Sequence, residues 1–180
     1  MRTFRHLTAA LVVLPLVISA CTNTPVDPTV NLGQTTFDEF FKNTFYMSWY
    51  EPGYAVYPSE DVDGFNSAVA KIASHLNAGG EGNYKMVMVL KPNCGCQHTQ
   101  REMPRVMKTL DQAGFSRDNI ELWLTDSPLN GIDEIKSLYN IDVAPTFLLL
   151  QGDSELGRIE VEDDTPGSTI SIELANLFDK

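Results

Sequence analysis

The stretch that most constrains the fold of this chain runs from Lys85 to Pro104. Met86–Leu90 is a continuous apolar run, which is typical of a central strand covered on both faces. A short loop with two cysteines, Cys94 and Cys96, follows, and then a stretch with helical spacing begins. A helix N-terminus carries unsatisfied N–H groups and a partial positive charge, and both favour a thiolate over a thiol. The sequence therefore predicts a nucleophilic cysteine where the helix begins.

The first 20 residues resemble the signal peptide of a bacterial lipoprotein. Arg2 and Arg5 precede a short apolar run, Leu7–Ile18, and Cys21 follows a small residue as in a lipobox. The resemblance implies that Cys21 becomes the first mature residue and carries the lipid; the alternative is an ordinary secretory peptide. The run is too short to span a bilayer. We therefore expect a lipid-anchored protein of the cell envelope, on the periplasmic face of the outer membrane or the outer face of the cytoplasmic membrane.

The remaining chain is long enough for one domain with a proper core. Removal of Arg2 and Arg5 leaves 11 of the 13 basic residues against 24 acidic ones, a net charge of −13. No basic patch is visible, which argues against nucleic acid as a partner. Cys94 and Cys96 are the two cysteines left besides Cys21, so a framework of structural disulfides is excluded. The pair is either redox-active or part of a metal site.

The pattern along the chain predicts an α/β sandwich with a mixed sheet. Residues 21–35 are expected to form a flexible tether, and residues 36–180 the domain, with 36–60 as its N-terminal extension. A helix should begin at Phe37, capped by Thr35 or Thr36, and Tyr54–Tyr57 is expected to form an edge strand. Further on, the order is helix (61–76), strand (85–90), helix after the cysteines, strand (120–125), helix (133–139), two strands (143–150 and 156–161) and helix (169–178).

An aromatic cluster lies in the extension, from Phe45 to Tyr57. Two interpretations are open for it, packing against the sheet or forming the wall of a substrate groove. His75 falls near the end of a predicted helix, where a histidine more often interacts with the helix terminus than with a ligand.

Three features together resemble the thioredoxin family. Two cysteines stand between a strand and a helix, Pro104 lies inside that helix, and Pro145 opens a later strand after Val143-Ala144. The resemblance covers roughly residues 61–180 and implies a thioredoxin-like three-layer α/β/α sandwich with a mixed central sheet. In the family a Cys-x-x-Cys begins the helix, eight positions before the proline. Counting back from Pro104 gives Cys96, and the second cysteine position falls on Thr99.

The active-site register departs from the family in several places. Cys94 is an addition two residues upstream, and an alternative alignment pairs Cys94-Gly95 with the Cys-Gly of related bacterial proteins. Gly95 stands where the family has a tryptophan, and Leu90 where it has a buried aspartate. These departures make the chain a poor candidate for a general reductase.

The resemblance implies a role for each site residue. Cys96, at the helix N-cap, is the attacking thiolate, and Thr99, one turn on, points its hydroxyl at that sulfur. Cys94 is the resolving partner, since Gly95 lets the backbone fold tightly, and the small ring would be a strained, oxidising disulfide. Pro145 corresponds to the family's cis-proline, beside which Ala144 would bind a substrate strand. Lys91 either adds positive charge near the thiolate or is a solvated loop residue.

Three functions remain open from the sequence. The first is a thiol–disulfide oxidoreductase or isomerase, which acts on protein thiols and disulfides and needs no cofactor. The second is a module that binds or delivers Cu(I) or Zn(II) through Cys94, Cys96 and His98, for which His75 is the one distant candidate ligand. The third is a redox-inert binding module with the inherited fold.

Overall fold

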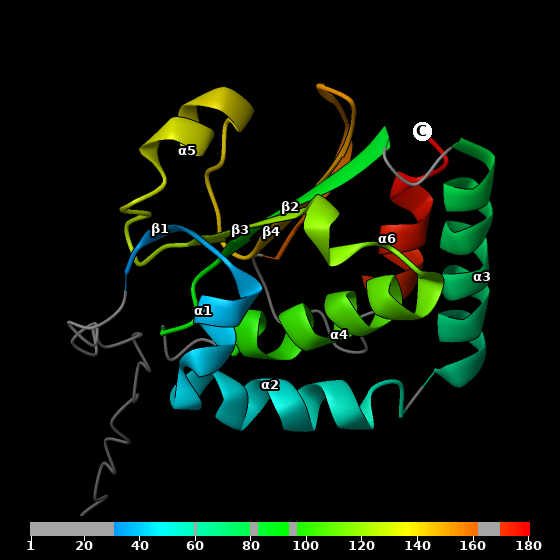
Figure 1. The fold of residues 1–180 in the computed structure, drawn as a ribbon, viewed down its shortest axis with the longest axis horizontal. Helices are drawn as coiled ribbons and strands as arrows, with labels where there is room; N and C mark the ends of the chain where they lie inside the picture. The colour runs from blue at the N-terminus through cyan, green and yellow to red at the C-terminus, as the bar shows by residue number, and fades with distance from the viewer. Residues whose placement is uncertain (1–30, 60, 80–82, 94–96, 162–169) are drawn as a thin grey trace, which may run out of the picture.

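The computed structural model describes residues 31–59, 61–79, 83–93, 97–161 and 170–180. Cys21, Cys94 and Cys96 lie outside these ranges, so the signal peptide, most of the tether and both predicted sulfur roles are left as predictions. The described chain forms a five-stranded sheet with the order β1-β3-β2-β4-β5 and six α-helices around it (Figure 1).

The strands from β2 onward follow the order expected from the sequence. They are β2 (Tyr84–Leu90), β3 (Ile120–Leu124), β4 (Thr146–Gln151) and β5 (Ser154–Glu160). β2 pairs parallel with β3 and antiparallel with β4, and β4 pairs antiparallel with β5. The parallel pair needs a helical crossover, whereas a tight turn joins β4 to β5. The expected mixed sheet is therefore confirmed.

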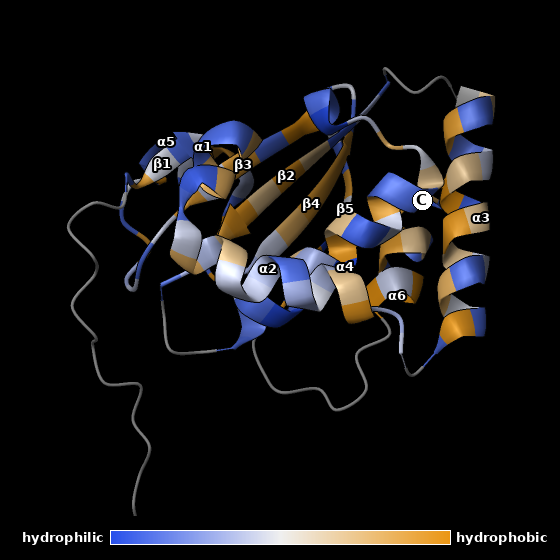
Figure 2. Ribbon diagram, turned by 60° about the horizontal axis from the view of Figure 1, so that its bottom comes forward, coloured by the Kyte–Doolittle hydropathy of each residue, from blue (hydrophilic) through white to orange (hydrophobic). Residues whose placement is uncertain are grey.

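Helices cover both faces of this sheet and make three layers. Helix α5 (Asp133–Tyr139) lies on one face, while α4 (His98–Ala113), α6 (Ile170–Leu177) and α3 (Val62–Gly79) lie on the other (Figure 1). The side chains of β2 alternate accordingly. Met86 and Met88 pack toward α4, and Val87 and Val89 pack in the cluster with α5. Both faces are apolar because both are covered, and Figure 2 shows most of β2 and β4 as hydrophobic.

Two segments near the N-terminus differ from the expectation. The last residues of the expected tether form a short strand, β1 (Gly33–Thr35), which pairs antiparallel with β3. The expected edge strand at Tyr54–Tyr57 is wrong, because this segment is the end of helix α2 (Thr44–Val56). The tyrosines at 46, 50, 54 and 57 recur with helical spacing and pack inward, and this period outweighs the strand propensity of the local sequence.

The N-terminal helices form a further layer over α4. Helix α1 (Phe37–Lys42) is capped by Thr36, whose side chain accepts a hydrogen bond from the N–H of Glu39, as expected. Helix α2 packs against α4, so the aromatic cluster covers a helix and not the sheet directly. Lys108 of α4 donates to the carbonyl oxygens of Tyr54 (2.8 Å) and Ala55 (3.4 Å). These carbonyls belong to the last turn of α2, so the lysine caps that helix terminus.

Candidate functional site

The candidate site lies at the carboxyl end of β2, where the chain turns into α4. β2 ends at Leu90, Lys91 to Asn93 follow, and α4 begins at His98 with Gln97 as its N-cap residue. Gln97 makes no capping hydrogen bond through its side chain to any described residue. The expectation that Cys96 is the N-cap is therefore corrected by one position. Cys96 directly precedes the cap in the sequence, and it lies outside the described residues together with Cys94.

Thr99 joins the strand to the helix at this point. Its side chain is fully buried, and its hydroxyl oxygen accepts a hydrogen bond of 3.1 Å from the backbone N–H of Lys91. A threonine hydroxyl has one proton to donate and two lone pairs, so this bond leaves the proton available for another acceptor. The predicted contact between this hydroxyl and the sulfur of Cys96 remains a prediction, because the sulfur is not described.

The loop before β4 lies at the same end of the sheet. The Ala144–Pro145 peptide bond is cis, as expected from the sequence. In the register of the sheet Thr146 pairs with Val89, which places Pro145 level with the end of β2. The carbonyl of Pro145 accepts from the N–H of Val161 (3.1 Å), and Ala144 is buried. The predicted role of these two residues in binding a substrate strand remains a prediction.

The end of β3 completes the framework of the site. The N–H of Thr125 donates to the carbonyl of Leu90 at 2.8 Å, directly before Lys91. The carboxyl ends of parallel strands meet at one edge of a sheet, and ligand sites of α/β proteins concentrate there. Thr99 and Thr125 thus bind the chain at Leu90 and Lys91, where β2 ends.

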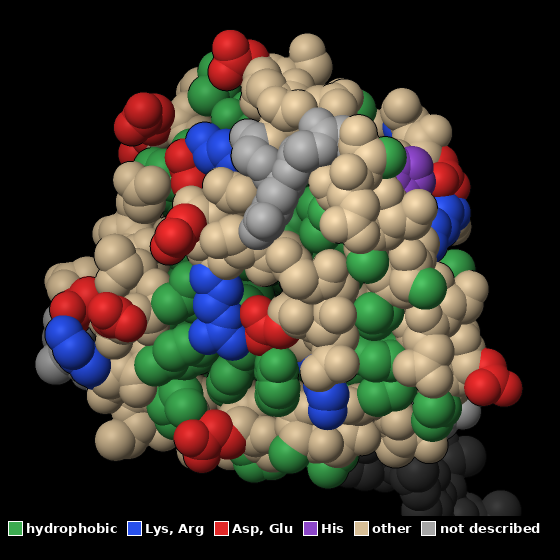
Figure 3. Space-filling view, turned by 45° about the vertical axis from the view of Figure 1, so that its right-hand side comes forward, with side chains coloured by type: hydrophobic (Ala, Val, Ile, Leu, Met, Phe, Trp, Pro, Cys, Tyr) green, Lys and Arg blue, Asp and Glu red, His purple; other side chains and the backbone are tan. Residues whose placement is uncertain are grey.

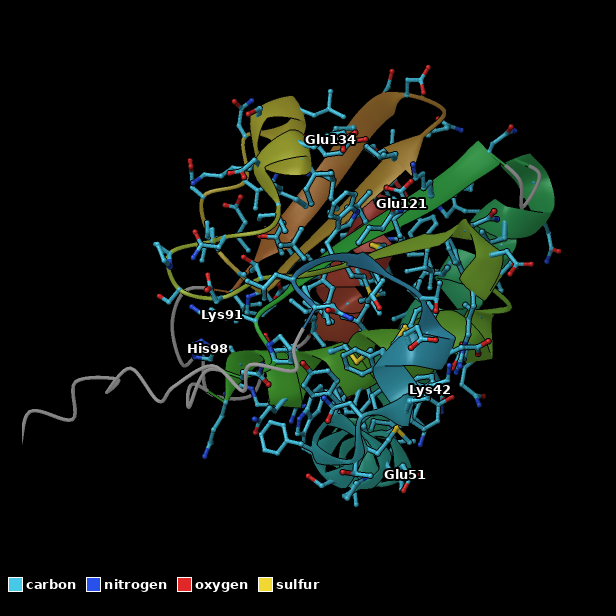
Figure 4. The ribbon with its side chains drawn as sticks, turned by 60° about the vertical axis from the view of Figure 1, so that its left-hand side comes forward. Lys42, Glu51, Lys91, His98, Glu121 and Glu134 are labelled. Carbon is cyan, nitrogen blue, oxygen red and sulfur yellow. The ribbon has the colours of Figure 1, made fainter. Side chains whose placement is uncertain are left out.

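Lys91 and His98 lie at this edge, and Figure 4 shows their side chains at the same end of the molecule. Both are half-buried. His98 is the first residue of α4, two positions after Cys96 in the sequence. Of the alternative metal ligands Cys94, Cys96 and His98, the structure thus describes only His98, and it lies at the end of the sheet where the site is expected. Among the residues that the structure describes, no three His, Cys, Asp or Glu side chains are grouped as metal ligands would be.

His75 belongs to another part of the molecule. Its Nε2 atom lies 3.1 Å from the Oδ1 atom of Asp179, and its ring is 6.2 Å from the ring of Phe178. Phe178 in turn packs against Tyr84, the first residue of β2, with 5.1 Å between the ring centroids. A strand of this length spans about 20 Å, so His75 lies at the opposite end of β2 from Lys91 and the start of α4. This placement argues against His75 as a further ligand of the alternative metal set.

A buried carboxylate, Glu102, was not singled out in the sequence. It is 1% exposed and lies one turn after Thr99 on α4. Arg101 donates to its Oε1 atom through Nε, and the guanidinium of Arg105 is 3.6 Å from the same oxygen. A buried carboxylate needs such partners, because desolvation penalises its charged form. One signal in the sequence could have predicted this burial. The helical spacing of Thr99, Met103 and Val106 places position 102 beside the apolar stripe of the helix.

Arg105 connects this carboxylate to the extension and, through Tyr57, to α6. The guanidinium of Arg105 lies over the ring of Tyr57, 5.3 Å from its centroid, and the hydroxyl of Tyr57 donates to Ser171 at 2.9 Å. Burial is the main cause that raises the pKa of Tyr57 above its ordinary value. The hydroxyl therefore stays protonated and acts as a donor at neutral pH.

Comparisons with known proteins give little beyond the fold. No family model and no curated protein matches the chain. Among solved structures, thioredoxin O2 from Arabidopsis thaliana in its oxidised state is 16% identical, with 62% of this chain and 86% of that chain covered and a TM-score of 0.36. A protein of unknown function from Pseudomonas aeruginosa is 14% identical, with 81% and 93% covered and a TM-score of 0.34. The α/β sandwich with a mixed sheet is seen directly, in the strand order and in the helices on both faces (Figure 1).

Proposed function

We propose that this protein is a thiol–disulfide oxidoreductase or isomerase of the cell envelope. One observation supports the proposal: in the sequence the cysteine pair falls between the end of β2 and the start of α4, and Pro145 lies level with that end of β2. The partial positive charge of the α4 N-terminus favours a thiolate there. The partners are protein thiols and disulfides.

In the proposed reaction the Cys96 thiolate attacks a sulfur of a substrate disulfide. The substrate S–S bond breaks, a mixed disulfide forms on Cys96, and the released thiolate takes up a proton. The thiolate of Cys94 then attacks Cys96, which forms the Cys94–Cys96 disulfide and releases the reduced substrate. A dithiol donor must then return the pair to its reduced state. In the isomerase direction a second thiolate of the substrate attacks the substrate sulfur of the mixed disulfide, which forms a new disulfide in the substrate, releases the Cys96 thiolate and consumes no electrons.

The proposal includes attachment to a membrane through lipid on Cys21, after removal of residues 1–20. The lipobox-like sequence is its support. No helix in the described part of the chain has the length and apolar composition needed to cross a bilayer.

The test uses the full-length chain and a disulfide-containing protein substrate. We expect Cys94→Ser to accumulate a mixed disulfide on Cys96, and Cys96→Ser to form none and to lose turnover, with Cys21→Ser as the matched control that keeps activity. Titration against a glutathione series should give one two-electron transition. The proposal would be contradicted if Cys96 were alkylated at the rate of an ordinary free thiol and the glutathione titration showed no transition. Cu(I) binding that His98→Ala abolishes would instead favour the metal-binding alternative.

A further inference from the structure

The outer surface of α2 carries almost no charge. The exposed residues of α2 are Thr44, Phe45, Ser48, Glu51, Pro52, Ala55 and Val56. Glu51 is the one charged residue among them, and no described position of α2 is basic. Four large hydrophobic residues are exposed in the described chain, and Phe45 and Val56 of α2 are two of them, at 51% and 67% exposure. We call Phe45, Pro52, Ala55 and Val56 the neutral face.

The fold keeps the neutral face turned outward. Tyr46 and Tyr50 bury the opposite side of α2, and Lys108 of α4 holds its last carbonyls. In Figure 1, α2 is the outermost layer on this side, with α4 between it and the sheet and α5 beyond the sheet. In the lower half of Figure 3, at the level where α2 lies in Figure 1, hydrophobic side chains lie together with a few charged ones. No other described segment covers this surface.

We propose that the neutral face docks on the surface of a phospholipid bilayer. The inference rests on the membrane attachment proposed above, and it is independent of the thiol chemistry. Nine residues separate Cys21 from Asn31, where the described chain begins, and the ten steps from Cα to Cα span at most about 35 Å. A domain of this size has a diameter of about 40 Å, so an anchored domain stays within contact distance of the lipid.

Charge selects which surface makes the contact. The chain without its first 20 residues carries 24 acidic and 11 basic residues, so most of its surface is repelled by anionic headgroups. The neutral face meets the bilayer without this repulsion. Its aliphatic and aromatic side chains suit the boundary between headgroups and acyl chains. The expected ligand is therefore the interface of a neutral, phosphatidylcholine-like bilayer, with weaker docking on anionic vesicles.

The two tryptophans of the chain report on opposite sides of the domain. Trp49 is on α2, and Trp123 is on β3 in the cluster with α5. The experiment places full-length Trp123→Phe and Trp49→Phe variants, each with one tryptophan left, on phosphatidylcholine vesicles with brominated acyl chains. Bromine quenches indole emission at short range. We expect Trp49 to lose most of its emission and Trp123 to keep it.

Substitutions separate docking from attachment. A Phe45→Ser, Val56→Ser double variant should still float with the vesicles and should lose the quenching of Trp49. Leu138→Ser is the matched control, because Leu138 is 65% exposed on α5, and it should leave the quenching unchanged.

Three results would overturn the proposal. Flotation without quenching of Trp49 would refute docking and leave attachment intact. Failure to float would refute attachment and docking together. The third result combines two measurements. If Trp49 is not quenched on vesicles, and the double variant sediments more slowly than the wild type without vesicles, the neutral face would instead be a contact between two copies of the chain.

Discussion

Replacement of Thr99 by valine tests how the helix of the candidate site is held to the sheet. Valine keeps the shape of the side chain and removes the hydroxyl that accepts the N–H of Lys91. An unsatisfied buried donor costs about 1–3 kcal/mol, and since Lys91 is only half-buried we expect about 1–2 kcal/mol. For a domain of this size that is a fall in Tm of about 2–8 °C.

Two measurements check this prediction. Urea unfolding gives the loss of stability, and hydrogen exchange measured by NMR gives the protection of the Lys91 amide. The amide should exchange faster in Thr99→Val. In the control Thr99→Ser the amide should stay protected, while the lost methyl group costs about 1 kcal/mol. A valine variant as stable as the wild type, with the Lys91 amide still protected, would refute the reasoning.

Two further predictions concern the rest of the domain. Burial, followed by the hydrogen bond to Asp111, raises the pKa of Tyr54 to about 12, whereas the unfolded chain ionises near 10. The stability that the neutral phenol contributes is present below pH 10 and is lost as the pH rises toward 12. Between these pH values the urea midpoint of Tyr54→Phe should therefore fall less steeply than that of the wild type. The same pH dependence of the midpoint in both proteins would contradict this prediction. Gly114 ends α4 with φ +81°, and a methyl group added to its Cα would meet no heavy atom within 4 Å. Gly114→Ala should therefore cost about 1 kcal/mol from backbone conformation alone, and Gly114→Asn less, measured by thermal unfolding; equal stabilities of the two variants would argue against a purely conformational cost.

The sequence predicted the elements whose period is strong. The spacing of Val62, Phe65, Val69 and Ile72 marks α3, and the run Met86–Leu90 marks β2, because one or both faces of each element are buried. It failed at Tyr54–Tyr57, where a short stretch of β-formers continues a helix. β1 was also missed. A strand of three residues has too short a pattern to be seen, and it exists because β3 offers it an edge.

The candidate site, too, could be predicted from the sequence only in part. The cysteines, Thr99 and Pro145 were recognisable from their spacing around one strand and one helix. The burial of Glu102 between Arg101 and Arg105 could not be recognised in the sequence. Gln100, Arg101 and Glu102 follow one another, and such a run of polar and charged residues on a helix normally indicates a solvated face. The layer formed by α2 over α4 turns that side of α4 inward.

The sequence by itself determined the order of elements, the α/β class and the placement of the cysteine pair between β2 and α4, because these follow from local periodicity and chain order. Only the tertiary structure decided that Thr99 binds the end of β2, that His75 lies far from the start of α4, and that the exposed side of α2 carries almost no charge. Those facts depend on which elements pack against each other, and packing between segments distant in the chain leaves no periodic trace in any one of them.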